Sequence, residues 1–215
     1  MKNAVFTFCF TLLSVGAFAQ AKTIKLDNPS FEDFTGAGHA PKGWLDCGFA
    51  GETPPDVCPT GQFRVTQDAK KGATYLGMVT RDNQTFEAVG QKLKSPLLPD
   101  TCYEFTVELM SSPIYMSQSR VTGEDVNFNK PTKLVVCGGR KLCEQMEVLA
   151  ESPIIQLHDW RLFRFTIRPT KQFDFIVFTA YYPISPVVKY TNGNLLVDNL
   201  SDIKPCNCLK SEGQN

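Results

Sequence analysis

Cysteine supplies the clearest candidates for covalent chemistry in this chain, which contains eight of them. Disulfides form in oxidising compartments, whereas cytosolic proteins keep their thiols reduced. The connectivity stays open from sequence alone, but short separations favour pairs that close local loops. A zinc site is disfavoured because the C-x-x-C spacing is missing. The pairings that we favour are Cys47 with Cys58, Cys137 with Cys143, and Cys102 with Cys206 or Cys208.

Carboxylates and histidines are the other candidates for chemistry, and their spacing argues against catalysis. A glycosidase needs two carboxyl groups about 5.5 Å apart for retention, or about 6.5–9.5 Å apart for inversion. Glu104 and Glu108 share one face of a predicted strand, but four residues at about 3.3 Å each place them about 13 Å apart. Neither His39 nor His158 lies in a nucleophile or zinc motif. The sequence therefore predicts a protein that is not an enzyme.

Aromatic side chains offer binding chemistry, because exposed rings pack on the CH-rich faces of sugars while nearby polar groups bind the hydroxyls. Rings in turns or at strand ends are the best candidates. The long loop over residues 111–131 adds polar groups, and loops of that length are commonly functional. Trp44 can alternatively plug one end of the fold. The predicted ligand-binding residues are Trp44, Tyr115, Arg120, Asn127, Tyr181 and Tyr182.

The elements that must position these side chains are mostly strands. Apolar and polar residues alternate cleanly over residues 103–109 and 163–168, the period of half-buried strands, and about nine such segments are separated by turn signals. Residues 142–150 alone read as helix, because apolar residues recur there at helical spacing before Pro153. We therefore predict an all-β fold, a single antiparallel β-sandwich with one short helix.

The N-terminus reads as a signal peptide over residues 1–19, with Lys2, an apolar stretch and the cleavable pattern Ala17-Phe18-Ala19. We expect a β-sandwich binding domain over residues 20–205 and a short polar tail over residues 206–215. No later stretch approaches the roughly 20 apolar residues that span a bilayer. The 22 basic and 22 acidic residues cancel, so no charge excess favours nucleic acid. We expect a secreted protein in the periplasm, at the outer membrane or at the cell surface.

Several short motifs follow one another in a characteristic order. The sequence NPSFE opens the mature chain at residues 28–32, GW follows at 43–44, GATYLG at 72–77, and LVDN closes the series at 196–199. This series resembles the galactose-binding-like jelly rolls, especially carbohydrate-binding modules. It is similar to the sandwich domains of secreted envelope proteins of Bacteroidota, and it covers nearly all of the mature chain. The resemblance implies a jelly-roll sandwich that binds a glycan.

The resemblance also implies a structural Ca²⁺ that ties the first strand to the last. Matching the motifs makes Glu32 and Asp198 the side-chain ligands and gives the backbone carbonyls to the region of Gly72. Carboxylates and carbonyls are the oxygen ligands that Ca²⁺ prefers. The closing motif here carries Asp198-Asn199, where such modules commonly have two acids, so this site has one carboxylate fewer.

Taken together, these features predict a secreted, non-catalytic binding module whose partner is a glycan or another cell-envelope polymer. The alternative is a structural or adhesive subunit of an outer-membrane or cell-surface protein complex, in which the same loops contact protein. A concave aromatic platform with convergent polar groups would favour the glycan, and a flat apolar patch would favour the protein partner.

Overall fold

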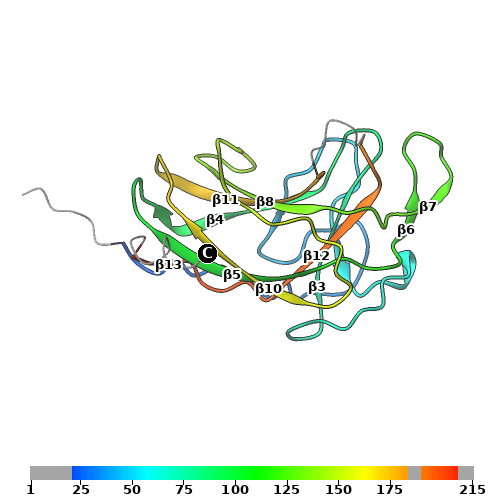
Figure 1. Cartoon of the computed structure of the whole chain (residues 1–215), viewed down its shortest axis with the longest axis horizontal. Helices are drawn as coiled ribbons and strands as arrows, with labels where there is room; N and C mark the ends of the chain where they lie inside the picture. The colour runs from blue at the N-terminus through cyan, green and yellow to red at the C-terminus, as the bar shows by residue number, and fades with distance from the viewer. Residues whose placement is uncertain (1–20, 184–189, 208–215) are drawn as a thin grey trace, which may run out of the picture.

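The computed structural model describes residues 21–183 and 190–207, which fold into two antiparallel β-sheets packed face to face (Figure 1). The front sheet, the upper layer in Figure 1, has the order β1 (Leu45–Asp46), β4 (Ala88–Leu97), β11 (Phe173–Tyr181), β8 (Lys133–Gly139) and β9 (Glu147–Glu151). The back sheet has the order β10 (Arg161–Ile167), β5 (Tyr103–Met110), β12 (Gly193–Asp198), β3 (Tyr75–Thr80) and β2 (Asp56–Cys58), and β13 (Lys204–Pro205) pairs with β5.

The strand order is that of a jelly roll. The strands β3, β4, β5, β8, β9, β10, β11 and β12 follow one another along the chain. Numbered in that sequence, they stand in the order 1-8-3-6 in the back sheet and 2-7-4-5 in the front sheet. This interleaving of two four-stranded sheets is the double Greek key of jelly rolls. The predicted antiparallel sandwich is therefore confirmed.

Alternating side chains explain why these segments form strands that face one core. In β5, Phe105 and Val107 point between the sheets, and in β11 Ile176 and Phe178 do the same. The side chains between them point outward, as Val177 does on the front sheet. The period of two that the sequence shows is thus the period of burial.

A two-stranded ribbon extends one end of the sandwich. β6 (Met116–Gln118) and β7 (Asp125–Asn127) form it within the long loop over residues 111–131, and it lies at the right-hand tip in Figure 1. The short 3-10 helix η1 (Gly61–Phe63) packs beside it. Residues 63–66 contain the end of η1 and Val65, which forms a single bridge with Thr60.

The predicted helix over residues 142–150 is wrong. Its second half is β9, which pairs with β8, and the first half is a turn closed by the amide of Glu144 donating to the carbonyl of Lys141. Cys143 has a positive φ of 61°, which a right-handed helix does not allow. Leu142 and Met146 are exposed, so their helical spacing does not mark a buried face.

The predicted signal peptide lies outside the described residues, as does most of the predicted polar tail. No helix within residues 21–183 and 190–207 has the length and apolar character needed to cross a membrane.

Candidate functional site

The outer face of the front sheet carries a pocket of about 380 Å³, which we call the sheet-face pocket. Its volume falls within the range of about 300–1,000 Å³ that is usual for small-ligand sites. It is mostly apolar, with a few polar groups at its floor and rim. The lining residues are Phe86, Val135, Cys137, Gln145, Val148, Glu151, Thr179 and Tyr181.

Strand register brings these residues together from distant parts of the chain. Thr179 in β11 stands opposite Val135 in β8, and Val135 stands opposite Glu151 in β9. Two residues further along β8, and past a shift in register, Cys137 stands opposite Val148. Residues directly opposite on antiparallel strands share a face, so these side chains form neighbouring rows on the outside of the sheet.

Aromatic rings form one wall of the pocket. The ring of Phe86 meets that of Phe49 edge to face at 4.9 Å between centroids, and that of Tyr181 at 5.1 Å. The ammonium of Lys133 lies 5.9 Å from the centre of the Tyr181 ring and pairs with the Glu151 carboxylate at 2.6 Å. These contacts fix the orientation of Tyr181 before any ligand arrives.

The floor of the pocket contains a buried hydroxyl without a partner. Thr179 is 1% exposed, and its Oγ1 forms no hydrogen bond within the described part of the chain. A buried polar group left unpaired costs about 1–3 kcal/mol, so such groups are uncommon in folded proteins. A ligand hydroxyl would supply the missing partner once small shifts of the lining side chains let it reach Oγ1.

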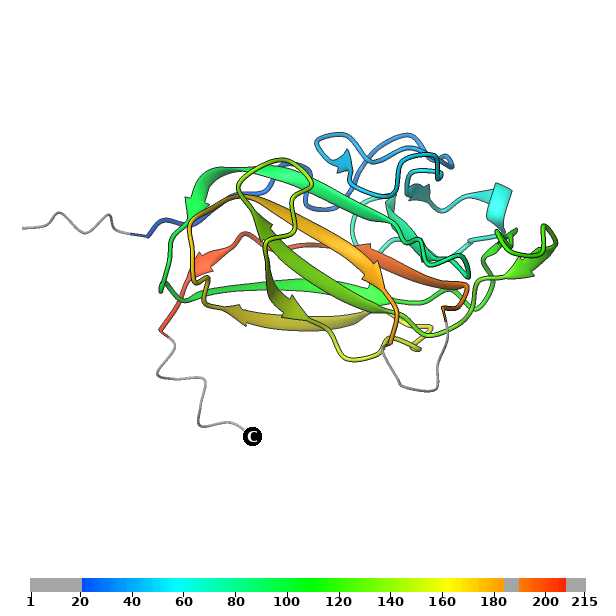
Figure 2. The same cartoon turned by 90° about the horizontal axis from the view of Figure 1, so that it is seen from above.

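A disulfide between Cys47 and Cys143 anchors the loop that contributes Gln145 to the sheet-face pocket. It joins residues 96 positions apart in sequence. We call the loop over residues 140–146 the strap; Figure 2 shows it arching in yellow-green over the front sheet toward β1. The predicted pairings of Cys47 with Cys58 and of Cys137 with Cys143 are therefore wrong, because the fold brings the strap to β1 rather than closing either local loop.

Among the described residues, the remaining cysteines are one further half-cystine and three free thiols. Cys102 is disulfide-bonded, but Cys206 is a free thiol, so the predicted bond between these two is wrong. The alternative partner, Cys208, lies outside the described residues. Cys58 and Cys137 are buried free thiols, and burial raises the pKa of Cys137 to about 11. Its thiol therefore stays protonated and unreactive at neutral pH.

Two predicted platform residues are buried and serve the fold instead. Trp44 is 4% exposed and packs against Phe31 and Phe178 in the core. Tyr115 is 1% exposed, and its hydroxyl donates to the buried carboxyl of Asp56. Neither ring can meet a ligand, which corrects both predictions and favours the plug role for Trp44.

The other predicted ligand residues lie apart from one another. Asn127 holds the ribbon together, because its Oδ1 accepts from the amide of Tyr115 at 2.9 Å. Arg120 pairs with Glu52 at 2.8 Å at the ribbon end of the molecule. Tyr182 is buried and its hydroxyl contacts the carbonyl of Arg81. Of the six, Tyr181 alone lines the sheet-face pocket.

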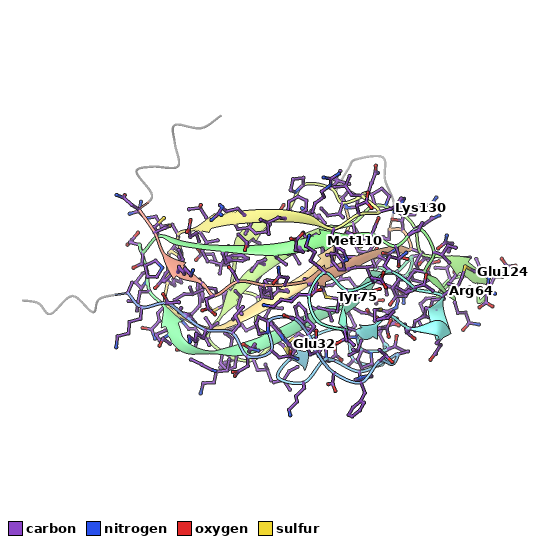
Figure 3. The ribbon with its side chains drawn as sticks, turned by 90° about the horizontal axis from the view of Figure 1, so that it is seen from below. Glu32, Arg64, Tyr75, Met110, Glu124 and Lys130 are labelled. Carbon is purple, nitrogen blue, oxygen red and sulfur yellow. A yellow bond between two sulfur atoms is a disulfide. The ribbon has the colours of Figure 1, made fainter. Side chains whose placement is uncertain are left out.

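The predicted calcium residues converge on one loop of the opposite face. Asp198 Oδ2 accepts from the amide of Lys71 at 2.9 Å, and the carboxylate of Glu32 accepts from the amide of Ala73 at 3.1 Å. Gly72 lies between them with a φ of 74°, and a side chain there would collide with Glu32. Figure 3 shows Glu32 on the lower side, away from the tip that carries Arg64.

The electrostatics of this loop are those of an acid pair. Burial raises the pKa of Asp198 to about 6, the surrounding amides oppose this rise, and the nearby Glu32 carboxylate adds to it. The described residues include no group of three or more acidic, histidine or cysteine side chains placed to bind a metal. A cation here would therefore need backbone carbonyls beside the two carboxylates.

A second cavity, of about 440 Å³, lies between η1 and the ribbon. Its lining is mainly polar and includes Gln62, Arg64, Gln118 and Asp125. Arg64 marks its position in Figure 3. The sheet-face pocket is the better candidate, since ligand sites are commonly apolar cavities with a few convergent polar groups.

Sequence reasoning missed most of the sheet-face pocket. Phe86, Gln145 and Glu151 stand in unremarkable local contexts and meet only through the sheet. One signal was present: Val177, Thr179 and Tyr181 alternate with core residues, and they place a hydroxyl and a ring on the outer face of a central strand.

Comparisons with solved structures show what the fold is similar to. A cyclase from Fischerella sp. TAU has a TM-score of 0.52 and 16% identity, covering 86% of this chain and 98% of the other, which shows a shared sandwich fold. The xylan-binding module CBM22-1 from Paenibacillus barcinonensis has a TM-score of 0.47 and 14% identity, covering 87% and 97%. The K1 cleaved adhesin domain of Lys-gingipain from Porphyromonas gingivalis W83 has a TM-score of 0.48 and 11% identity, covering 83% and 96%.

Carbohydrate-binding modules are thus among the solved structures that the chain is similar to, as are adhesin domains from a gingipain. No protein-family model matches the chain, and no curated protein matches it in sequence.

Proposed function

We propose that this chain is an extracellular, non-catalytic module that binds a glycan of the cell envelope or its surroundings in the sheet-face pocket. The observation that carries the proposal is the unpaired Thr179 hydroxyl on the pocket floor, next to the ring of Tyr181 along the same strand. A ring paired with a buried, unsatisfied hydroxyl suits a ligand that presents CH groups and hydroxyls together, which describes a sugar.

The remaining lining groups fit the same ligand. The Gln145 amide offers both a donor and an acceptor, and the Glu151 carboxylate offers acceptors. Phe86 and Val148 supply apolar contact. A few polar groups on an apolar surface can orient a ligand that carries no charge. The zero formal net charge of the whole chain agrees with an uncharged ligand.

The pocket does not support hydrolysis of the sugar. Glu151 is the sole carboxylate among its lining residues, and it is paired with Lys133. Glycoside hydrolysis by the usual route needs two carboxyl groups on either side of the bond. The lining therefore favours binding over catalysis.

Disulfide chemistry supports the proposed location. The Cys47–Cys143 bond and the bonded Cys102 are of the kind that persists in oxidising compartments. We place the protein outside the cytoplasm, in the periplasm, at the outer membrane or at the cell surface.

Substitution of Tyr181 tests the proposed function. We expect Tyr181→Ala to weaken glycan binding by about 30-fold or more, because truncation of a central aromatic contact costs about 2 kcal/mol. The measurement is isothermal titration calorimetry with soluble xylan, laminarin, mannan and peptidoglycan fragments. Phe34→Ala is the matched control, since Phe34 is an aromatic side chain, 89% exposed, outside the pocket lining. Equal losses in both variants would contradict the site.

A protein partner is the second candidate function. Large apolar side chains stay exposed on the strap, on β9, and on or just after β1. They are Leu45, Phe49, Leu142, Met146 and Val148. Exposed apolar patches often mark protein interfaces. If no glycan binds and one envelope protein is recovered by cross-linking through these residues, an adhesive or structural subunit is the better description.

We also propose that Glu32, Asp198 and carbonyls near Gly72 hold a structural Ca²⁺. The donor chemistry fits, because two carboxylates converge on one loop and the burial of Asp198 disfavours its charge unless a cation compensates it. Such an ion would tie the segment that precedes β1 to the end of β12.

The calcium proposal predicts a pH-dependent stabilisation. Without the ion, the raised pKa of Asp198 means that the folded state holds a proton that the unfolded state releases, so stability falls as pH rises from about 4 through 6. Ca²⁺ binds the ionised form, so we expect it to raise Tm more at pH 7.5 than at pH 5. At a concentration one hundred times Kd the gain is about 2.7 kcal/mol.

Differential scanning fluorimetry with Ca²⁺ or a chelator measures this effect. Asp198→Asn should lose the Ca²⁺ response, while Asp100→Asn, an exposed acid far from the loop in the chain, should keep it. An identical Ca²⁺ response in both variants would contradict the assignment.

A further inference from the structure

The strap crosses most of the front sheet. It starts at the end of β8, and β11 and β4 stand between β8 and β1. Three strand spacings of about 4.8 Å make that distance about 14 Å. Nevertheless the Cα atoms of Cys47, which follows β1, and Cys143 are 5.0 Å apart. The strap therefore spans from β8 over β11 and β4 to the far edge.

The strap lies directly on the sheet, with no space for a ligand beneath it. A Cβ at Gly139 would meet the carbonyl oxygen of Glu144 at 2.1 Å, and a Cβ at Gly90 would meet Cys47 Sγ at 2.7 Å. Glycine is needed at both positions because the strap and its disulfide occupy the place of a side chain. The outer face of the sheet is thus closed at the strap.

Internal hydrogen bonds hold the strap in this position. The Glu144 carboxylate accepts from the amides of Arg140 at 2.8 Å and Lys141 at 3.1 Å, and the amide of Met146 donates to the carbonyl of Gly138 at 2.9 Å. With the disulfide, these bonds anchor the strap at its start, middle and end. It is a fixed wall rather than a mobile lid.

The strap bounds the sheet-face pocket on one side, and aromatic rings bound it on the adjacent side. Gln145 of the strap lines the pocket directly. At the β4 side, Phe86 lines it, and the half-exposed ring of Phe49 packs behind Phe86. A ligand lying along the strands meets the strap, and a ligand lying across them toward β1 meets Phe86 and Phe49.

We infer that the pocket takes the terminal sugar unit of a glycan chain and not an internal segment. This inference rests on the proposed function and narrows it to chain ends and short oligosaccharides. A polymer needs an entrance and an exit, whereas two adjacent sides of this pocket are closed. The volume of about 380 Å³, near the lower end of the range for ligand sites, suits a short terminal segment. Gln145, which lines the pocket from the strap, would contact the end of the chain.

The test varies the number of chain ends at constant mass of glycan. Xylan, laminarin, mannan and peptidoglycan strands are used intact and after partial hydrolysis, by mild acid for the first three and by a muramidase for the last. Isothermal titration calorimetry gives the number of protein molecules bound per gram. We expect this number to rise in proportion to the number of ends. An unchanged number would overturn the inference while leaving glycan binding intact.

The double substitution Cys47→Ser with Cys143→Ser supplies the matched comparison. Without the disulfide the strap can lift, so binding per gram should depend less on chain ends and should increase on the intact polymer. Gln145→Ala is the milder variant, which should weaken end binding in the folded, strapped protein. If neither intact nor hydrolysed glycan binds the wild type, the proposed function itself fails, which is a different outcome from binding that ignores chain ends.

Discussion

Methionine in place of Arg81 is expected to lower the free energy of unfolding by about 3–5 kcal/mol, because it leaves a buried carboxylate without its cation. The Arg81 guanidinium contacts Glu87 Oε1, and both side chains are buried. Glu87 also accepts from the amide of Val79 at 3.0 Å, so it cannot turn away to solvent without losing a backbone contact. Urea unfolding followed by tryptophan fluorescence measures the change.

The stability lost in Arg81→Met should increase with pH. Burial raises the pKa of Glu87 well above its ordinary value, and Arg81 opposes that rise. Without Arg81 the pKa of Glu87 climbs further, so the folded state of the variant is most penalised at high pH. We expect a larger loss of stability at pH 8 than at pH 5. The double variant Arg81→Met with Glu87→Gln should recover part of it.

Arg164→Met is the control for Arg81. Arg164 also pairs with a carboxylate, Glu104, at 3.4 Å, but both side chains are exposed. Exposed ion pairs contribute about 0–1 kcal/mol, so this variant should unfold close to the wild type. A loss below about 1 kcal/mol for Arg81→Met would show that the buried pair does not hold the β3–β4 turn as described.

Removal of the Cys47–Cys143 disulfide is expected to lower the free energy of unfolding by about 4–5 kcal/mol, since a cross-link closing a loop of roughly 100 residues restricts the unfolded chain strongly. The two residues are 96 positions apart, so the loop that this bond closes is close to that length. For a chain of this size the loss corresponds to a fall in Tm of about 10 °C or more. Calorimetry of the Cys47→Ser, Cys143→Ser variant measures it.

A second readout separates the strap from general destabilisation. Cys137 lines the sheet-face pocket beside the strap and is nearly buried. When the strap is released, alkylation of Cys137 should accelerate under native conditions. Cys206→Ser, which removes a free thiol outside the sheets, should change neither Tm nor this rate. Unchanged Tm in the double variant would contradict the structural role of the bond.

Much of the fold follows from local sequence. The alternation over residues 103–109 and 163–168 predicted β5 and β10, because each strand buries one face and exposes the other to solvent. β11 is apolar on both faces, which agrees with its place in the middle of the front sheet, where its outer face is partly covered. The local sequence of these segments is therefore enough to indicate strands.

Features that depend on contacts between distant residues could not be predicted from the sequence. Leu142 and Met146 have helical spacing, but pairing with β8 and the bond to Cys47 override it. The disulfides were assigned to near neighbours in sequence, whereas the sheet order brings β1 to the strap. The sheet-face pocket is hidden for the same reason, because Phe86, Glu151 and Thr179 meet only when non-consecutive strands are paired.

The central claim, that the sheet-face pocket binds a sugar through Thr179, is tested most directly by Thr179→Val. This change keeps the shape of the side chain and removes a buried hydroxyl that lacks a partner in the described residues. We predict that the variant is more stable by about 1 kcal/mol but binds the glycan about fivefold more weakly. Calorimetric titration and thermal unfolding of the same samples give both values. A variant that binds as tightly as the wild type would contradict the claim.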